Sequence, residues 1–464
     1  MGDIMKKITV KSFMAAYVLV FLSLIFLTST IHAQESEKER RNSAEDYMSP
    51  ESVYHESGNW GENLTWELRD GVLTISGTGE TPDYSWDTWL DSDYPDFMSD
   101  NELPWEMGDI TEEITEVIIE PGVTGIGDGS FYHCGMTNLT LPDTVTHIDA
   151  WAFCECASLT AISGIGSVKE IGQGAFDGCR NLINIDLSGV HYIDEGAFRG
   201  CGLTDVVIPY GMKSISYETF AYCPRLTEVI LPDSVKKIGR GAFTFCGLKT
   251  ITLPETLETI GSQAFSYCRD LTEVIIPDSV LAMSSDAFSD CDNLKAVHIS
   301  DKNKCYSVYE GAVLNKDKTE LIFCPAGISG EYSVPESVIS AEAGAFSGCS
   351  KLERIVIPEG LQEISREMFD GCSGLRSITI PAGVQEIGCW AFCGCSSLTQ
   401  IYFAGDRPDF AVEDDVDGGS VDEIFNGVTA TAYYPGDNPT WETPPDGNFR
   451  GGNITWVPLD DAGA

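Results

Sequence analysis

Apolar residues recur through most of this chain at a fixed interval, and that interval predicts how the chain folds. The repeating unit is shown by Leu226-Thr-Glu-Val-Ile-Leu-Pro-Asp-Ser-Val-Lys-Lys-Ile-Gly-Arg-Gly-Ala-Phe-Thr-Phe-Cys246, and related units follow one another from about residue 114 to about residue 403. Within each block the phenylalanine of the Ala-Phe-x-x-Cys tail returns every 22 or 23 residues: Phe131, Phe153, Phe176, Phe198, Phe220, Phe243, Phe265, Phe288, then Phe346, Phe369 and Phe392. A period in this range is typical of a solenoid, in which each unit forms one coil.

Each unit contains three short pieces with different preferences. The first, as in Leu271-Thr-Glu-Val-Ile-Ile-Pro277, alternates β-branched and polar residues and ends at proline, which favours a strand. The second is a shorter extended segment, such as Val235 to Ile238, and the third, Ala-Phe-x-x-Cys, has room for one helical turn. We therefore expect an α/β repeat solenoid of 22–23-residue coils with a parallel β-sheet, short second strands, single helical turns and β-rich caps at both ends.

Two residue types should form internal columns along this solenoid. A single coil has too few neighbours to bury its own apolar side chains, so the phenylalanines are expected to stack into a spine. Eleven of the 16 cysteines also share one place in the repeat, which favours a column of small buried side chains over a disulfide scaffold: Cys134, Cys156, Cys179, Cys201, Cys223, Cys246, Cys268, Cys291, Cys349, Cys372 and Cys395.

The limits of the repeat predict how the chain is divided. The solenoid covers residues 114–403, and its period breaks at a hairpin insert of about residues 301–331. Residues 58–113 form an N-terminal β cap, in which Asp70-Gly71 joins two alternating segments and is a strong hairpin signal. Residues 404–464 combine an acidic loop with a C-terminal β cap.

The insert has two cysteines outside the regular column. Its sequence predicts a hairpin that turns at Asn315 to Thr319, after which Tyr332-Ser-Val-Pro335 resumes the strand. Cys305 and Cys324 flank this hairpin, and in an exported protein they either pair across it or remain free thiols. The sequence leaves both alternatives open.

The N-terminal segment predicts export. Residues 1–33 place three lysines before an apolar run from Phe13 to Leu27, which is typical of a signal peptide. The run also approaches the length that crosses a bilayer, so an uncleaved anchor is the alternative. Residues 34–57 are charged and lack apolar periodicity, and we expect a flexible linker there.

The charge of the chain limits its partners. Its 28 basic and 72 acidic residues give a formal net charge of −44. Such a chain repels nucleic acid and anionic lipid, so we expect neither as a partner, and a membrane contact only through the N-terminal segment if it is uncleaved. The remaining expectation is a protein partner that is basic or neutral where it touches this chain.

Two segments offer metal-ligating side chains. Cys389, Cys393 and Cys395 supply three thiols, but no histidine is close in sequence to complete a zinc site. The acidic run 413–423 is similar to a calcium loop, but Ile424 stands where that loop needs a bidentate glutamate. We expect no metal and no cofactor, with weak calcium binding by the acidic run 413–423 as the alternative.

Catalytic motifs are missing from the sequence. There is no Gly-x-Ser-x-Gly elbow, phosphate-binding loop or His-Glu-x-x-His pattern. Most carboxylates fall at outward positions of the repeat, such as Asp233, Glu255 and Asp278, where a soluble surface requires charge. A hydrolase with a pair of carboxylates stays an alternative because so acidic a chain contains many candidate pairs.

An aromatic segment lies ahead of the first repeat. Trp86, Trp89 and Trp105 are suited either to covering the exposed end of the solenoid core or to binding a sugar or peptide.

The outer face of the first strands is the candidate binding surface. Because side chains alternate along a strand, Val229 and Leu231 should face the core and Ile230 should face out. The equivalent residues form what we term the outward strip: Ile118, Thr140, Ser163, Asp186, Val207, Ile230, Thr252, Ile275, His298, Val356, Thr379 and Tyr402. Its β-branched, mostly uncharged side chains suit either strand formation alone or contact with a partner.

The repeated text L-x-x-I-x-[IL]-P-[DE]-[SGT]-V-x-x-I-G-x-x-A-F-x-x-C resembles that of the BspA-like (Treponema-type) leucine-rich repeat surface proteins. The flanking segments Gly61-Glu-Asn-Leu-Thr-Trp66 and Val428-Thr-Ala-Thr-Ala-Tyr-Tyr-Pro435 are also similar to that family. The resemblance covers about residues 58–458. It implies a bacterial surface or secreted protein without catalytic residues, of a family in which several members are associated with adhesion.

These observations together predict an exported, non-enzymatic leucine-rich repeat protein that binds other proteins in the manner of an adhesin and acts as a monomer. The alternatives are a carbohydrate-binding surface protein that uses the tryptophan segment and, less favoured by the motifs, an extracellular hydrolase.

Overall fold

The structure is a computed structural model that describes residues 55–84, 113–411, 413–414, 420–421, 423–445 and 448–459. The chain divides into two units, Met1–His55 and Glu56–Ala464, and the second contains the repeats. The expected signal segment 1–33, most of the linker 34–57 and the tryptophans Trp86, Trp89 and Trp105 lie outside the described residues. None of the described residues belongs to a helix with the length and apolar character that crossing a bilayer requires.

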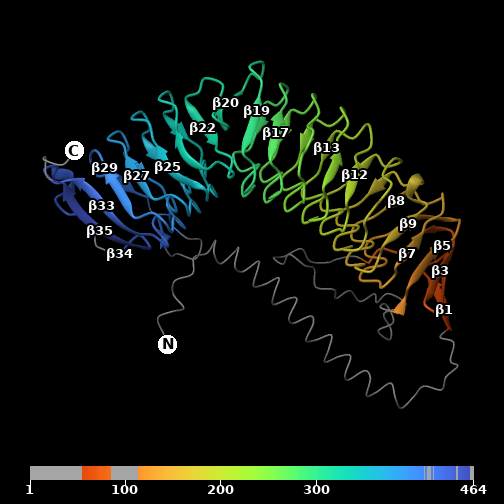
Figure 1. The fold of residues 1–464 in the computed structure, drawn as a ribbon. Coiled ribbons are helices and arrows are strands. Elements are labelled where there is room, and N and C mark those ends of the chain that lie inside the picture. Colours follow the sequence, from red (N-terminus) through yellow and green to blue (C-terminus); the bar gives the residue numbers. More distant parts are fainter. Residues whose placement is uncertain are drawn as a thin grey trace, which may run out of the picture. The chain divides into compact units, whose positions relative to one another are not determined.

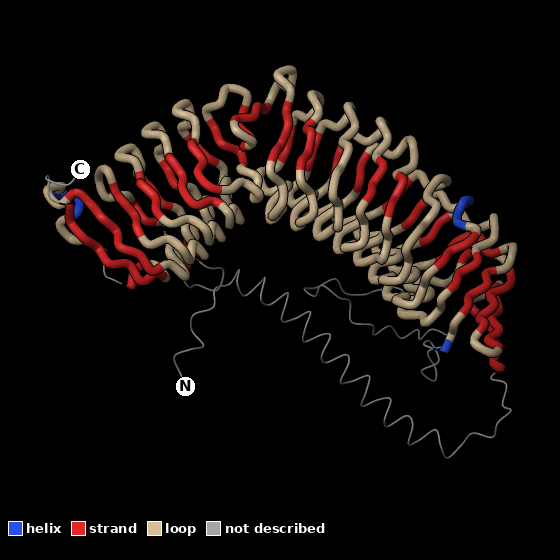
Figure 2. Tube along the Cα trace, in the orientation of Figure 1, coloured by secondary structure: helices blue, strands red, loops and turns tan. Residues whose placement is uncertain are grey.

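Most coils have two short strands and a turn-rich third side (Figures 1 and 2). In a typical coil the first strand is β14 (Glu228–Ile230), and the second, β15 (Lys237–Ile238), follows a corner at Pro232. Burial alternates along β14, where Val229 is buried between two exposed residues. The period-two pattern of the sequence therefore places one side of each strand in the core.

The first strands of successive coils pair in parallel. The pairing is in register, so that Val206 lies beside Val229 and Ile275 beside His298. These strands are β5 (Glu116–Ile119), β7 (Asn138–Thr140), β9 (Ala161–Ser163), β12 (Asp205–Val207), β14, β17 (Glu273–Ile276), β19 (Ala296–Ile299), β23 (Gly330–Ser333), β25 (Leu352–Val356), β27 (Ser377–Ile380) and β29 (Gln400–Phe403). Among the described residues they fall into four sheets rather than one, because the coils that contain Asp186 and Thr252 have no assigned first strand and the insert follows β19, but the pairing between neighbouring coils is the parallel one expected from the repeat.

The second strands form another set of parallel pairs along the solenoid. Most have only two residues, because the segment between the corner and the tail is short. They are β4 (Gly79–Glu80), β6 (Val123–Ile126), β8 (His147–Ile148), β10 (Glu170–Ile171), β11 (Tyr192–Ile193), β13 (Ser214–Ile215), β15, β16 (Thr259–Ile260), β18 (Ala282–Met283), β24 (Ser340–Ala341), β26 (Glu363–Ile364), β28 (Glu386–Ile387) and β30 (Asp409–Phe410).

The Ala-Phe-x-x-Cys tail forms turns on the third side of each coil. The N–H of Phe220 donates to the carbonyl of Ala242 in the next coil (2.9 Å), whereas the N–H of Ala221 donates within its own turn (3.0 Å). Glu218 and Tyr222, on either side, have left-handed backbones with φ of 49° and 58°. The residue before the cysteine is left-handed in the other coils too: His133, Glu155, Gly178, Gly200, Phe245, Tyr267, Asp290, Gly348, Gly371 and Gly394.

These left-handed residues explain why the expected single helical turns are not confirmed. A helix needs consecutive right-handed residues, and a left-handed one interrupts it and redirects the neighbouring N–H groups toward the next coil. Among the described residues, the named helices are two 3₁₀ turns, η2 (Ile165–Ser167) and η3 (Pro439–Trp441). The α component of the expected α/β class is therefore not confirmed, and the described fold is a β-solenoid.

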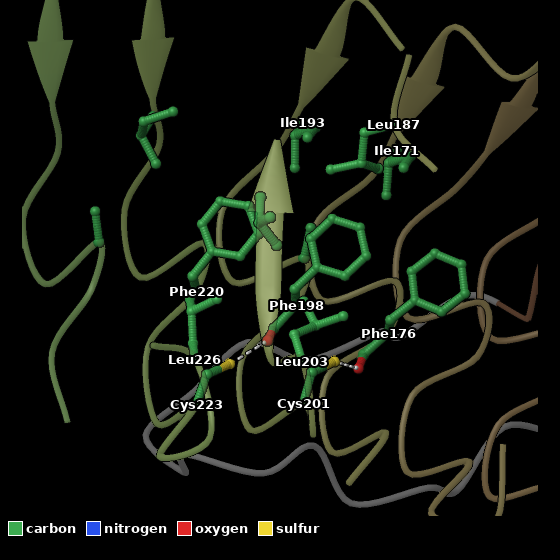
Figure 3. Packing of buried hydrophobic residues seen from close by; sticks show 14 of the residues in the cluster. Ile171, Phe176, Leu187, Ile193, Phe198, Cys201, Leu203, Phe220, Cys223 and Leu226 are labelled. Carbon is green, nitrogen blue, oxygen red and sulfur yellow. Dashed lines mark hydrogen bonds between the residues drawn. The ribbon is translucent and has the colours of Figure 1, made fainter. Parts of the chain in front are cut away.

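The phenylalanines of the tails stack inside the solenoid (Figure 3). Neighbouring rings lie nearly parallel, with centroids 5.6 Å apart for Phe220 and Phe243 and 5.5 Å apart for Phe243 and Phe265. All eleven tail rings are buried. Each ring thus covers the apolar face of the next, which no coil can do alone.

The column of cysteines has a role that the repeat did not reveal. Cys201 Sγ donates to the carbonyl of Phe176 at 3.1 Å, and Cys223 Sγ donates to the carbonyl of Phe198 at 3.2 Å (Figure 3). The same contact links most neighbouring coils. The thiol is therefore both a small buried side chain and a weak donor to a buried carbonyl.

The insert is a group of antiparallel strands that packs between two hydrophobic clusters of the core. It consists of β20 (Tyr306–Tyr309), β21 (Ala312–Asn315) and β22 (Glu320–Phe323), and both turns reverse the chain into antiparallel pairs. Both β21 and β22 contribute residues to the two hydrophobic clusters on either side of the insert. Strands that are buried on both faces read as continuous apolar runs, as these do.

The two extra cysteines of the insert are free thiols. Cys324 is buried and takes the backbone position of a tail phenylalanine, because its N–H donates to the carbonyl of Ala345 in the next coil (2.7 Å) and its own carbonyl accepts from Cys349 Sγ (3.6 Å). The ring that stacks on Phe288 at this point is that of the neighbouring Phe323. Cys305 is half-buried. Of the two alternatives left by the sequence, the structure therefore has the unpaired one.

Both ends of the solenoid carry additional strands. At the N-terminal end, β1 (His55–Trp60), β2 (Leu64–Arg69) and β3 (Val72–Gly77) extend the sheet beyond β5, and β2 and β3 meet at the Asp70-Gly71 turn. Trp60 packs edge-on against Phe131, the first ring of the spine, at 5.6 Å. An aromatic side chain thus covers the end of the core.

At the C-terminal end, β33 (Thr429–Pro435), β35 (Gly452–Leu459) and β34 (Asn448–Phe449) extend the sheet beyond β29. Phe425 continues the ring stack from Phe392 at 5.4 Å. A separate antiparallel pair joins β31 (Glu413–Asp414) to β32 (Ser420–Val421), and the rest of the acidic run 413–423, apart from Glu423, lies outside the described residues.

Removing one ring from the middle of the spine should lower stability. Phe243→Ala leaves a cavity between two stacked neighbours, and we expect a loss of about 3–5 kcal/mol in the free energy of unfolding. The control is Tyr210→Ala, since Tyr210 is 86% exposed and its removal should change stability by less than about 0.5 kcal/mol. Chemical denaturation of both variants measures the difference, and equal stabilities would contradict the placement of the spine.

The thiols should differ sharply in reactivity. Burial raises the pKa of Cys223 and Cys268 to about 12, so almost no thiolate forms at neutral pH. Cys305 is the one cysteine that is not buried. In the native protein a maleimide should therefore label Cys305 first, while denaturation exposes all the others. Fast labelling of a column cysteine, located by peptide mapping, would contradict this assignment.

Candidate functional site

The outward strip lies on the solvent side of the first strands. Val207 of β12 pairs with Ile230 of β14, and both are exposed. The residues before them, Val206 and Val229, also pair with each other, and their side chains are buried in the core. Most other members are also exposed, and Ile118 and Tyr402 are half-buried. The strip is therefore a surface feature formed by the same alternation that builds the core.

The structure does not keep the strip continuous. The insert separates His298, on β19, from Val356, on β25. Beyond it, Thr379 and Tyr402 are neighbours, and Tyr402 stacks on Tyr433 of the C-terminal cap at 4.9 Å. The last contact was not evident from the repeat because Tyr433 lies outside it.

We term the last five positions before the insert the central strip: Val207, Ile230, Thr252, Ile275 and His298. Its three aliphatic residues are among the most exposed large apolar side chains of the described chain, at 58, 52 and 66% for Val207, Ile230 and Ile275. Thr252 is exposed between the last two. Exposed aliphatic side chains on successive coils give the molecule an apolar patch in an otherwise acidic surface.

Carboxylates line both sides of this patch. We term these carboxylates the acidic margins. On one side they stand two residues before a strip position: Asp205, Glu228 and Glu273. On the other side they stand three residues after one: Asp233, Glu255 and Asp278. All are exposed except Asp278, which is half-buried. The central strip is therefore apolar in the middle and negative at its edges.

A hollow of about 500 Å³ opens where the central strip meets the insert. We term it the strip hollow. Its lining includes Ile275, His298 and Val308 together with the charged residues Glu255, Asp278 and Lys302. Val308 comes from β20, which packs beside β19 at the point where the regular ladder ends. The hollow thus depends on the insert and has no counterpart in the repeat pattern.

A second hollow, of about 550 Å³, lies beyond the insert and is polar. Its lining residues lie at or just before the start of the first strands of three coils: Ser350, Lys351, Glu353, Gly374, Arg376, Ser397 and Thr399. Gly374 stands where the neighbouring coils have Lys351 and Ser397, and the missing side chain opens the space. The two cations are already engaged, because Arg376 lies 3.6 Å from Glu353 and Lys351 Nζ donates to the carbonyl of Asp292.

Three carboxylates converge near the N-terminal end of the solenoid. Oxygens of Asp83, Asp128 and Asp149 lie within 4.8 Å of one another, and no other such group of three or more histidine, cysteine or acidic residues occurs in the described part of the chain. Burial, the largest cause, raises the pKa of Asp128 and of Asp149, and the neighbouring carboxylates raise both further. These residues are far apart in sequence, so no sequence motif predicted that their carboxylates would meet.

This cluster has only part of what a calcium site needs. Calcium takes about six to eight oxygen ligands, more than three carboxylates provide. Two of the carboxylates also hold backbone groups, since Asp83 accepts from the N–H of Asp128 (3.1 Å) and Asp128 accepts from the N–H of Ala150 (2.8 Å). The arrangement therefore fits a structural role at the junction between the cap and the first coils.

The cysteines considered for zinc do not converge. Cys395 Sγ donates to the carbonyl of Phe369 at 3.1 Å, as a regular member of the column, and Cys389 Sγ donates to the carbonyl of Ala411 at 3.5 Å. Burial is also the first cause that raises the pKa of Cys395, which disfavours the thiolate that zinc binds.

Comparison with known proteins identifies the family. The sequence profile described as BspA type leucine rich repeat region (6 copies) matches residues 110–227, 213–329 and 329–407. The chain belongs to the BspA-type leucine-rich repeat family. Proteins of this family are typically non-enzymatic binding modules, and leucine-rich repeat domains generally mediate protein interactions.

Solved structures of bacterial repeat proteins are similar to this member of the family. A leucine rich cell surface protein from Faecalibacterium prausnitzii A2-165 is 25% identical with a TM-score of 0.52, and the match covers 85% of this chain and 98% of that one. A leucine-rich repeat protein from Bacteroides ovatus ATCC 8483 is 24% identical with a TM-score of 0.47, covering 85% and 98%. A search of curated proteins found no match.

The acidic cluster makes stability depend on pH. The pKa of Asp149 is raised by burial and by Asp128, Asp83 and Glu80, against the opposing effect of His147. With the folded-state pKa above the unfolded one, stability falls as pH rises through that interval, so the ionised carboxylate is destabilising at pH 7.

Asp149→Asn should therefore raise the melting temperature at pH 7, by the equivalent of up to about 1 kcal/mol. The gain should disappear in acid, once Asp149 is protonated in both the folded and the unfolded state. Thermal melts of the two proteins across this pH range measure the effect. A variant that is less stable than the original protein at pH 7 would show that the charge is needed.

Proposed function

We propose that this protein is an exported, non-enzymatic module that binds other proteins in the manner of an adhesin, through the central strip. The observation that carries the proposal is the run of exposed aliphatic side chains Val207, Ile230 and Ile275 on a chain with a net charge of −44. Exposed apolar side chains do not contribute to solubility. A group of them on neighbouring coils therefore indicates a surface that is buried against a partner.

Membership of the BspA-type family supports the same function. A similar solved structure is described as a cell surface protein, which agrees with the export signal expected at residues 1–33. The column thiols also fit a binding scaffold better than an active site, because burial keeps them protonated and hydrogen-bonded inside the core.

The test begins with affinity capture on the full chain from extracts of neighbouring bacteria and host cells, followed by identification of the captured protein. Its dissociation constant is then measured for Ile230→Lys/Ile275→Lys, which places two charges in the apolar patch. We expect binding at least about 10-fold weaker, since burying an unpaired charge at an interface costs more than about 1.4 kcal/mol.

Leu281→Lys/Ile339→Lys is the matched control. The side chains of these two aliphatic residues are 54 and 55% exposed, similar to the 52% of Ile230. They differ in position, because they lie next to the second strands β18 and β24. The control should bind the partner as tightly as the original protein. If the strip variant also keeps full affinity, the proposed docking surface is wrong.

A further inference from the structure

We propose that the strip hollow is the anchor site for a lysine or arginine side chain of the bound protein, and that the segment seated on the central strip is cationic. This inference rests on the proposed function and specifies the chemistry of its partner. It follows from the lining of the hollow, from the acidic margins and from the position of the insert.

The lining of the strip hollow combines apolar and acidic groups in one small space. Ile275 and Val308 provide aliphatic surface, and Glu255 and Asp278 provide carboxylates. A lysine or arginine matches this combination, because its methylene stem packs on apolar surface while its charged head meets a carboxylate. A purely aliphatic side chain would desolvate the carboxylates without pairing them, and an acidic one would be repelled.

The carboxylates of the hollow are available to a partner. Within the described residues neither Glu255 nor Asp278 forms an ion pair; Asp278 accepts a hydrogen bond from Ser300 Oγ, which leaves lone pairs for a further donor. Lys302 also lines the hollow but lies beyond ion-pair distance of both. By contrast, the cations of the polar hollow beyond the insert are already paired or hydrogen-bonded.

The acidic margins extend the same preference along the strip. Glu228 and Glu273 on one side, and Asp233 on the other, place negative charge beside apolar side chains on successive coils. Glu273 lies 3.7 Å from the imidazole Nε2 of His298, the last residue of the central strip. Together with the net charge of −44, the margins should steer a basic segment toward the strip and make the association rate fall with salt.

The insert explains why the anchor lies at one end of the strip. An ordinary coil presents the same open surface as its neighbours, whereas β20 places Val308 beside the end of the ladder and turns that surface into a hollow. A partner that lies along the repeats thus has one position at which it is held in register. Repetition alone would leave it free to slide by one coil.

The test uses the full chain and a synthetic peptide that alternates valine and arginine, with the same peptide carrying glutamine in place of arginine as the neutral comparison. Fluorescence anisotropy measures affinity at low and at physiological salt. We expect the arginine peptide to bind at least about 10-fold more tightly than the glutamine peptide at low salt, and its advantage to shrink as salt screens the charges.

The hollow variant is Glu255→Gln/Asp278→Asn, and its matched control is Glu336→Gln/Glu359→Gln. The control pair occupies the same repeat position, directly after the strand-ending proline, in coils beyond the insert and removes the same total charge. We expect the hollow variant to bind the arginine peptide at least about 10-fold more weakly and the control to bind it unchanged. Equal losses would overturn the inference, because they would mean that any acidic surface suffices.

Two further outcomes would also overturn it: equal affinity for both peptides, and no measurable binding of the arginine peptide. Thermal melts establish that each variant is folded. The proposed function fails separately, when Ile230→Lys/Ile275→Lys leaves binding of the captured protein intact. If that strip variant abolishes binding while the hollow variant does not weaken it, the function stands and the anchor assignment falls.

Discussion

The backbone of every coil depends on the next coil, and this dependence organises the whole molecule. The strands pair in parallel on two sides, and on the third the N–H of Phe220 donates to Ala242 of its neighbour. Buried backbone groups need partners, and segments of two to four residues cannot supply their own. The coils therefore stack in register over most of the solenoid, and side chains at equivalent repeat positions lie directly above and below one another.

The register of the coils arranges both the buried and the exposed side chains into columns. Inside, it stacks the phenylalanine rings and lets most column cysteines reach the phenylalanine carbonyl of the preceding coil. Outside, it sets Val207 beside Ile230 and a carboxylate at each edge. Residues at equivalent repeat positions thus line up along the solenoid, which is the way a solenoid presents a long contact surface.

The most individual part of the surface lies where the repetition stops. The insert follows β19, divides the core into two clusters and places Val308 against the central strip. The acidic cluster of Asp83, Asp128 and Asp149 likewise lies at a junction, between the N-terminal cap and the first coils. Features that distinguish this chain from a uniform array therefore gather at the ends and interruptions of the repeat, where neighbouring coils differ.

The sequence by itself determined the coil length, the two strands per coil, the phenylalanine and cysteine columns and the outward position of residues such as Ile230, because all of these follow from local alternation and from the period. It could not determine the turns of the tails. The left-handed backbones of Tyr222 and Phe245 are favoured only when the next coil receives the redirected N–H groups. Only the tertiary structure decided that Cys324 takes the backbone position of a tail phenylalanine and stays unpaired, that Val308 and Ile275 share a hollow, and that three distant aspartates meet. Each of these depends on which residues lie on neighbouring coils or across a junction, and a local pattern does not contain that information.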